Sequence, residues 1–202
     1  VEAFKNYCQY VTEQLGDLMH YVCTINEANM GIQVAAISAR YRAQMMAKMQ
    51  RMQQGGAEEK KDLEGTAQVG MNFNDMMANM QKQKEENVEI FGTDTLQTFV
   101  SARTPEGDML VIRAHQAART AMKAVKPELQ IGLTLSLHDI QAQEGGEETA
   151  AKEWVDEFTH YVPYIKEDDF FGLQNYSRSL IGPNGILPVP EGAEITQMDY
   201  EY

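Results

Sequence analysis

The first segment of the chain alternates apolar and polar residues with the period of an amphipathic helix. Gly16, a residue that commonly ends helices, follows this pattern, so the sequence predicts a helix over the first fifteen residues. The next run, residues 18–26, is rich in apolar and β-branched side chains and predicts a buried strand. The apolar face of the helix is predicted from four positions: Phe4, Cys8, Val11 and Leu15.

The middle of the chain, residues 31–106, is more polar and its periodicity is helical wherever it is regular. The Gly55-Gly56 pair breaks this pattern, and a Gly-punctuated loop is predicted to follow it. Three helices are predicted here, over residues 32–53, 72–86 and 93–102, with the loop over residues 57–70 and a turn at Pro105-Glu106-Gly107.

In the last part of the chain, strong helical and strand patterns alternate again. A helix with Leu110, Ala114, Ala117, Ala121 and Val125 on one face is predicted to stop near Pro127. A strand over 131–139, a helix over 147–165 and a strand over 169–177 follow. Strands separated by long helical connections pair in parallel, with helices outside. The sequence therefore predicts an α/β fold in one domain.

Composition and charge narrow the function classes. The 202 residues carry 30 acidic and 17 basic side chains, a net charge of −13, so no basic surface for nucleic acid or an anionic membrane is indicated. Two cysteines, Cys8 and Cys23, are too few and too far apart for a zinc motif or a disulfide framework. No signal peptide or membrane span is visible, which says little if the chain is a piece of a longer one; the protein is predicted to be cytoplasmic.

Polar residues gather where three apolar strands are predicted to end. They are Asn26-Glu27, His138-Asp139 and Gln174-Asn175-Tyr176. The carboxyl ends of parallel strands lie at one edge of a sheet, where α/β enzymes place their sites. Taken singly, each group is explained as well by capping of the next helix. Together they favour a site with amide and carboxyl groups, which bind and hydrolyse sugars. On spacing alone, Asp139 is the candidate for a second carboxylate.

At this point four blocks of the sequence resemble family 1 glycoside hydrolases, the β-glucosidase and 6-phospho-β-glucosidase family. "YVCTINEANMG" resembles the fourth-strand motif Thr-x-Asn-Glu-Pro, which carries the general acid/base. "AHQAARTAMKAVKPELQIGLTLSL" resembles the fourth helix and fifth strand, and "IKEDDFFGLQNYSR" resembles the sixth strand. "GPNGILPVPEGAEITQMDYEY" resembles the stretch after it.

The resemblance implies part of a (β/α)8 TIM barrel, from about the third helix to just past the sixth strand. Residues 1–202 would form one partial barrel domain, with 31–106 as an enlarged loop and helical Met-rich insertion after strand four. It also implies a retaining β-glycosidase without cofactor or metal. Glu27 matches the acid/base, Asn26 the residue that binds the sugar 2-hydroxyl, and Tyr176 the tyrosine that orients the nucleophile. Gln174 stands beside the sugar where Asn is usual, and Ala28 where Pro is usual.

The family's nucleophile motif, Thr-Glu-Asn-Gly, does not occur in the sequence. The isolated chain is therefore expected to be inactive, and to be a piece of a longer enzyme acting on β-linked oligosaccharides or aryl or alkyl β-glycosides. Alternatives stay open: a 6-phospho-β-glycosidase, or a non-catalytic sugar-binding protein. Thioethers at helical spacing could also hold Cu(I), although a packing face or lid explains them as well; the residues are Met46, Met49, Met52, Met77 and Met80. Sugar preference and oligomeric state are not indicated.

Overall fold

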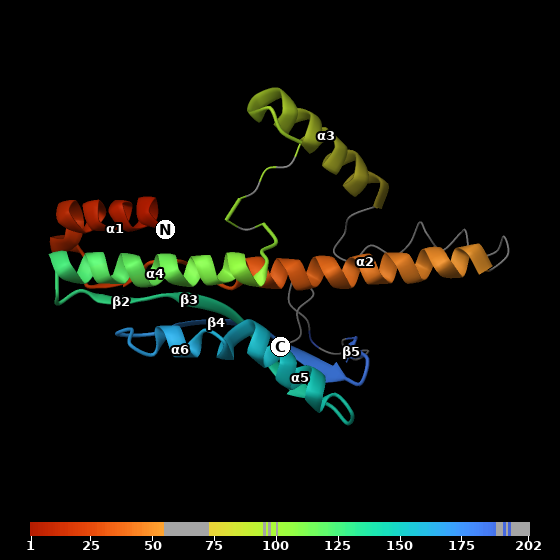
Figure 1. The fold of residues 1–202 in the computed structure, drawn as a ribbon. Coiled ribbons are helices and arrows are strands. Elements are labelled where there is room, and N and C mark those ends of the chain that lie inside the picture. Colours follow the sequence, from red (N-terminus) through yellow and green to blue (C-terminus); the bar gives the residue numbers. More distant parts are fainter. Residues whose placement is uncertain are drawn as a thin grey trace. The chain divides into compact units, whose positions relative to one another are not determined.

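The computed structural model describes residues 1–54, 73–94, 96, 98, 99, 101–188, 192 and 194. The chain divides into two compact units, one made of residues 1–35 and 102–202 and the other of residues 36–101. In the first unit, helix α1 (Glu2–Leu15) runs into the 3-10 turn η1 (Gly16–Leu18) and packs beside helix α4 (Pro105–Val125) (Figure 1). The helix predicted for the first fifteen residues is confirmed.

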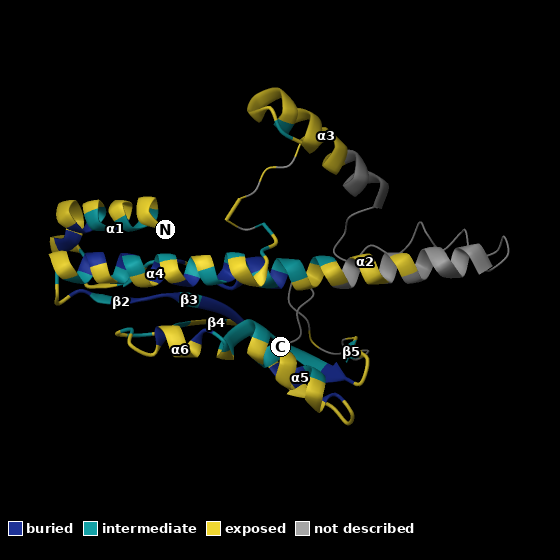
Figure 2. Cartoon of the chain, in the orientation of Figure 1, coloured by how far each residue is buried: buried dark blue, intermediate teal, exposed yellow. Residues whose placement is uncertain are grey.

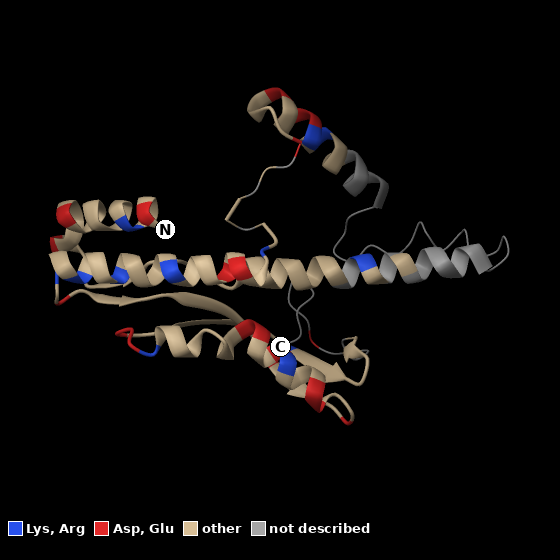
Figure 3. Ribbon diagram, in the orientation of Figure 1, with Lys and Arg blue, Asp and Glu red and all other residues tan. Residues whose placement is uncertain are grey.

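Helix α4 begins earlier than the sequence pattern predicted. The Thr104 side chain accepts a hydrogen bond from the Gly107 backbone N–H (3.2 Å), and Pro105 occupies the first turn, where its missing N–H costs nothing. The predicted turn at 105–107 is therefore wrong. Acidic residues at the start of α4 and basic residues further along it complement the helix dipole (Figure 3).

The buried face of α4 also differs from the predicted one. Leu110 and Val125 are exposed, because the face that packs inward is one position further round the helix and includes two polar residues, Asp108 and His115. Apolar spacing alone could not find this face, since it counts a buried aspartate and histidine as surface residues. The buried residues of α4 are Asp108, Ile112, His115, Ala118, Ala121 and Met122.

The strands pair in parallel, as predicted. Strand β1 (Tyr21–Cys23) pairs with β2 (Gln130–Gly132), and β3 (Thr134–Ala142) pairs with β4 (Gly172–Gly182). A two-residue strand β5 (Gly185–Ile186), which was not predicted, pairs antiparallel with the end of β4.

Strand limits differ from the predicted ones. The strand predicted over 18–26 is regular only at 21–23 and bends into a turn before helix α2 (Met30–Gln54). The strands predicted at 131–139 and 169–177 run on to Ala142 and Gly182. His138 and Asp139 therefore lie inside a strand and not at its end.

The helix predicted over 147–165 is three pieces: α5 (Glu147–Trp154), a π-helical turn η4 (Val155–Thr159) and α6 (Val162–Ile165). The His160 N–H bonds to the Val155 carbonyl five residues back (3.3 Å), which is the π pattern. Such insertions often lie at functional sites and re-aim the side chains around them.

The core lies between β3 and the helices that cover one of its faces (Figure 2). Leu133, Leu135 and Leu137 alternate along the chain and share that face, as the two-residue period of a strand requires. The intervening Thr134, Ser136 and His138 point to the opposite face. The other buried members of this cluster are Ile25, Ala28, Ile112, Tyr161 and Ile165.

The second unit contains most of α2 (Met30–Gln54) and all of α3 (Phe73–Phe91), close to two predicted helices. The helix predicted over 93–102 is wrong for the residues described there. Gly92 ends α3 with a positive φ of 71°, and Thr98 and Ser101 close a turn in which the Ser101 hydroxyl accepts from the Thr98 N–H (2.9 Å).

The Met-rich prediction falls mainly outside what the structure describes. Met46 and Met80 are exposed, whereas the side chains of Met49, Met52 and Met77 lie outside the described residues. Within the described part of the chain, no group of three or more His, Cys, Asp or Glu side chains could hold a metal ion. Among the helices of that same part, none combines the length and hydropathy needed to cross a membrane.

Candidate active site

The segment that carries Asn26 and Glu27 continues β1 as an irregular ladder against the β2–β3 chain. The Thr24 N–H donates to the Gly132 carbonyl (3.0 Å), and the Thr134 N–H donates to the Ile25 carbonyl (3.2 Å). After a tight turn, the Ala28 N–H donates to the Thr134 carbonyl (2.9 Å). The turn therefore sits over Thr134.

Glu27 has a left-handed backbone conformation. Its φ is 49°, and among the described residues it is the sole non-glycine with a positive φ. A residue other than Gly, Asn or Asp pays for this conformation, and such strain concentrates at functional sites. The conformation turns the chain back after Asn26 and leaves the Glu27 side chain partly exposed.

Thr134 is the centre of the polar cluster. Its hydroxyl accepts from the Glu27 N–H (2.8 Å) and donates to Asn26 Oδ1 (3.0 Å). Gln174 Nε2 donates to the same hydroxyl (2.8 Å) and to Asn26 Oδ1 (2.7 Å). The Thr134 side chain fits because Gly172 lies opposite it on β4, where a Cβ would come within 2.6 Å of the Thr134 methyl group.

A β-bulge brings Tyr176 into the same cluster. Along β3 and β4, Leu137 pairs with Asn175 and His138 pairs with Ser177, so Tyr176 is the extra residue. Bulges of this kind re-aim a side chain next to active sites. The Tyr176 hydroxyl donates to Gln174 Oε1 and also lies 3.3 Å from Glu27 Oε1.

The environment of Tyr176 agrees with a carboxylate neighbour. Partial desolvation, and then the negative charge of Glu27, raise the pKa of the Tyr176 phenol above its ordinary value. The phenol therefore stays a hydrogen-bond donor at neutral pH. Four residues singled out from the sequence, Asn26, Glu27, Gln174 and Tyr176, lie in one connected group.

Other polar residues from the sequence lie elsewhere. His138 Nδ1 contacts Glu157 Oε2 of η4 (3.0 Å), and Asp139 accepts from Gln141 Nε2 (2.7 Å). Asp139 follows Thr134 by five residues along β3, a rise of about 17 Å. This spacing argues against Asp139 as the second carboxylate beside Glu27.

Sequence reasoning missed Thr134, although a signal for it exists. The run from Leu133 to His138 alternates apolar and polar residues, which is the pattern of a strand with one face in the core and a second face free for polar contacts. When this run is taken as a strand buried on both faces, the polar face with Thr134 and Ser136 is overlooked.

The turn after Glu27 is anchored to β3 by an amide. Asn29 is fully buried; its Oδ1 accepts from the Ser136 N–H (3.0 Å) and its Nδ2 donates to the Ser136 carbonyl (2.6 Å). The Asn29 amide thus makes the two hydrogen bonds with Ser136 that the backbone of a neighbouring strand would make, at a point where that backbone has left the sheet. Gln33 Nε2 adds a second donor to the Ser136 carbonyl (2.8 Å).

A buried charged cluster, which we call the Asp108 cluster, lies behind the same turn and consists of Asp108, Arg103, His160 and Tyr161. The Tyr161 hydroxyl donates to Asp108 Oδ1 (2.6 Å), and His160 Nε2 lies 2.8 Å from Asp108 Oδ2. The Arg103 guanidinium lies 3.4 Å from Asp108 Oδ1 and donates to the Ala28 carbonyl. None of these contacts was predicted: His160, Tyr161 and Ala28 are far from their partners in sequence, and the segment of Arg103 and Asp108 was predicted to contain a turn.

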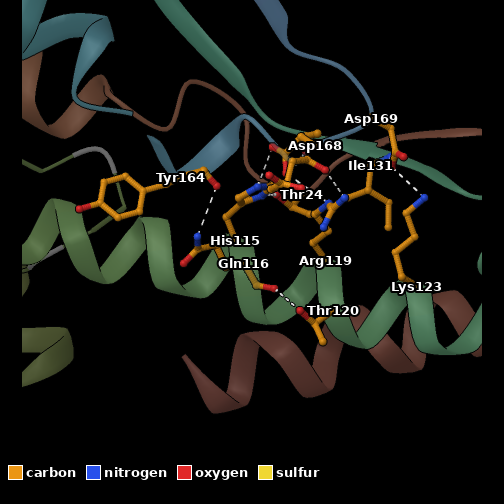
Figure 4. A network of polar contacts seen from close by, with 12 residues as sticks. Thr24, His115, Gln116, Arg119, Thr120, Lys123, Ile131, Tyr164, Asp168 and Asp169 are labelled. Atoms are coloured by element: carbon orange, nitrogen blue, oxygen red, sulfur yellow. Dashed lines mark hydrogen bonds and ion pairs between the residues drawn. The ribbon is translucent and has the colours of Figure 1, made fainter. Parts of the chain in front are cut away.

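A second network joins α4 to the start of β4 (Figure 4). His115, Arg119 and Lys123 point from one face of α4 toward the strands. His115 Nδ1 contacts the Thr24 hydroxyl (2.7 Å) and Nε2 contacts Asp168 (2.9 Å). This network holds the end of β1 two residues before Asn26. Asp168 thus has a structural role just before the amino end of β4.

The Thr-x-Asn-Glu-Pro motif has proline where this chain has Ala28. Replacing Ala28 by Pro is expected to destabilise this chain. Proline removes the N–H that bonds to the Thr134 carbonyl and disfavours the left-handed conformation of the preceding Glu27. Leaving a buried carbonyl unsatisfied costs about 1–3 kcal/mol. Denaturant unfolding measures the loss. Ala28→Gly, which keeps the N–H, is the control and should lose less; equal losses would contradict the explanation.

Stability is expected to fall as the pH rises above neutrality because of His160. Burial opposes its charged form, but hydrogen bonds to Asp108 and the Val155 carbonyl outweigh it, so the pKa of His160 is raised. Protonated His160 therefore stabilises the folded state. This contribution is fully present below the unfolded-state pKa of about 6.5 and is lost as the pH rises through the pKa of His160 in the folded state.

The free energy of unfolding between pH 5.5 and 8.5 measures this effect, as does the same series for His160→Gln. The wild-type curve should fall over the upper part of this range and the variant curve should be flatter. Burial raises the pKa of both Cys8 and Cys23, so the thiols do not obscure the window. Parallel curves would show that another group is responsible.

Comparison with known proteins places this geometry in a structural class. The structure is similar to that of β-glycosidase BGL167, with 32% sequence identity and a TM-score of 0.67 over 99% of this chain. It is also similar in fold to β-glucosidase 1317 (24% identity, TM-score 0.67, 100% of this chain) and to a hyperthermophilic β-glucosidase from Pyrococcus furiosus (17%, 0.52, 98%).

The chain spans only part of these proteins: 41% of the first two and 35% of the third. No protein-family model and no curated protein matches it. The mixed helix and sheet structure thus matches part of the chain of known β-glycosidases.

Proposed function

We propose that this chain is the central part of a retaining β-glycosidase of family 1, built on a (β/α)8 barrel, in which Glu27 is the general acid/base. The observation that carries the proposal is the cluster on one face of β3 and β4. There Glu27, whose backbone is strained, lies beside Tyr176 and close to the amides of Asn26 and Gln174. The similarity to β-glycosidase BGL167 supports the same assignment.

Each residue of the cluster has a distinct task in this mechanism. Glu27 donates a proton to the glycosidic oxygen as the aglycone leaves, and later removes a proton from the water that attacks the glycosyl-enzyme. Asn26 uses its Oδ1 to accept from Thr134 and Gln174, so its Nδ2 group is the part that can donate to a sugar hydroxyl. A contact of this kind strengthens in the transition state.

Gln174 and Tyr176 order the site around Glu27. Gln174 spans the distance between Asn26 and Tyr176, donating to the first through Nε2 and accepting from the second through Oε1. Tyr176, 57% exposed, can turn from Gln174 to a carboxylate nucleophile, which in a retaining enzyme stands about 5–5.5 Å from the acid/base.

The nucleophile would come from a further strand that carries the Thr-Glu-Asn-Gly motif, so the 202-residue chain alone is expected to hydrolyse nothing measurable. A 6-phospho-β-glycosidase remains the second candidate, because the residues that would bind the phosphate are not among those of this chain. A non-catalytic sugar-binding protein is less well supported, since sugar binding alone gives no reason for backbone strain at the glutamate of the site, Glu27.

A segment exchange tests the proposal. The chain replaces the corresponding segment of β-glycosidase BGL167, and hydrolysis of 4-nitrophenyl β-glucoside is measured for the chimera and for the chain alone. We expect turnover for the folded chimera and none for the chain. Turnover by the isolated chain, or a folded chimera that binds substrate without hydrolysing it, would contradict the proposal.

A further inference from the structure

The backbone just after Glu27 is held by an ion pair between Arg103 and the buried Asp108. Asp108 is 2% exposed, and the Arg103 side chain, which lies between it and the turn, is 12% exposed. Arg103 donates to the Ala28 carbonyl, one peptide bond from the proposed acid/base. Since the Ala28 N–H is bonded to the Thr134 carbonyl, the residue after Glu27 is held at both of its backbone polar groups.

Arg103 is fitted closely to this segment. Its own N–H donates to the Gly31 carbonyl (2.9 Å), and its side chain lies across Gly31, where a Cβ would come within 2.5 Å of the guanidine Nε. A side chain at position 31 would therefore displace Arg103. The requirement for glycine here depends on the arginine and not on an unusual φ.

Asp108 fixes the orientation of Arg103 because the other groups around it are all donors. Tyr161 donates to Oδ1, and its burial together with this bond raises the pKa of the phenol far above the ordinary value, so it remains protonated. His160 faces two acceptors, with Nδ1 2.7 Å from the Val155 carbonyl and Nε2 2.8 Å from Asp108 Oδ2. Both ring nitrogens must carry protons to satisfy this geometry.

The charged groups facing His160 come from two elements: Asp108 of α4, and Asp156 of the π-helical turn. The Tyr161 ring lies 4.0 Å from the His160 ring, between centroids. Asp108 thus balances two cations, Arg103 and His160, inside the fold. Such an arrangement is costly to desolvate, and its best attested use is to specify one geometry.

We propose that Asp108 is a positioning residue for Glu27, acting through Arg103 on the Ala28 carbonyl. It touches no substrate. Its task is to hold the left-handed turn so that the Glu27 carboxyl stays beside Tyr176. The inference rests on the proposed function for its catalytic meaning, whereas the mechanical link from Asp108 to the turn is independent of it.

Backbone NMR of the 202-residue chain tests the link without any need for hydrolysis. In Asp108→Asn, the amide resonances of Glu27 and Ala28 should shift, and exchange of the Ala28 amide should speed up by about tenfold or more. Gly31→Ala, which displaces Arg103 and leaves Asp108 in place, should have the same effect. It also keeps the proposal testable if Asp108→Asn does not fold.

Asp169→Asn is the matched control. Asp169 also pairs with a cation, Lys123 (2.8 Å), and also accepts from a backbone N–H, that of Ile131 (2.8 Å), but it lies at the other end of the strands. Its variant should leave the Glu27 and Ala28 amides unchanged. A folded Asp108→Asn or Gly31→Ala chain with wild-type exchange at Ala28 would overturn the proposal.

In the chimera, the positioning role predicts a lower kcat with an unchanged KM for Gly31→Ala, because the turn orients the acid/base and not the sugar. A rise in KM alone would contradict it. An inactive chimera would count against the proposed function, whereas the NMR result would still decide whether Asp108 holds the turn.

Discussion

Glu27→Gln in the chimera should lower the rate of hydrolysis by about 10²- to 10⁴-fold, the usual contribution of a general acid/base. Gln keeps the shape of the side chain and can still accept the Tyr176 hydrogen bond, but its amide is too weak an acid to transfer a proton to the glycosidic oxygen. The loss therefore reports proton transfer and not a collapsed site.

Leaving-group dependence separates acid catalysis from simple positioning. A 2,4-dinitrophenyl glucoside needs little protonation as it departs, so Glu27→Gln should slow its cleavage much less than that of an alkyl glucoside. Glu157→Gln provides a control carboxyl group, since the Glu157 carboxylate contacts His138 and is not part of the polar cluster around Thr134. Equal losses on both substrates would mean that Glu27 is not the acid.

The second large effect is expected for Asp108→Ala, which should cost about 3–5 kcal/mol of unfolding free energy, as breaking a buried ion pair does. The variant leaves Arg103, His160 and the Tyr161 hydroxyl without their common acceptor, a carboxylate whose side chain is almost fully buried. Urea or guanidinium unfolding at pH 6, where His160 is charged, measures the loss.

Asp17→Ala is the control for this experiment. Asp17 also forms an ion pair, with Lys126 Nζ at 2.7 Å, but its side chain is fully exposed. Pairs of that kind contribute little, because water and salt screen them and long side chains must be ordered to form them. Comparable losses in the two variants would show that burial does not set the value of the Asp108 cluster.

Ala28 illustrates how a departure from a motif can be compensated by structure. By sequence alone, alanine in place of proline removes a restraint from the backbone after Glu27. In the folded chain, the alanine N–H bonds to Thr134 and the carbonyl accepts from Arg103. Proline would supply neither the donor nor the freedom for Glu27 to take a φ of 49°.

Much of the fold was available from the sequence, because periodicity reports which positions face a core. The order of helices and strands and the parallel pairing both follow from apolar spacing and connection length. Limits were less accurate. Thr104 capping moved the start of α4 to Pro105, and a π-helical turn divided the helix predicted over 147–165.

The sequence by itself determined the residues of the candidate site, because Asn26, Glu27, Gln174 and Tyr176 follow apolar strand patterns and lie in recognisable motifs. Only the tertiary structure decided how they meet: through the Thr134 hydroxyl, a bulge at Tyr176, and a turn held by Asn29 and Arg103. Contacts between residues about a hundred positions apart leave no local pattern. A buried aspartate such as Asp108 reads as surface until its partners are assembled around it.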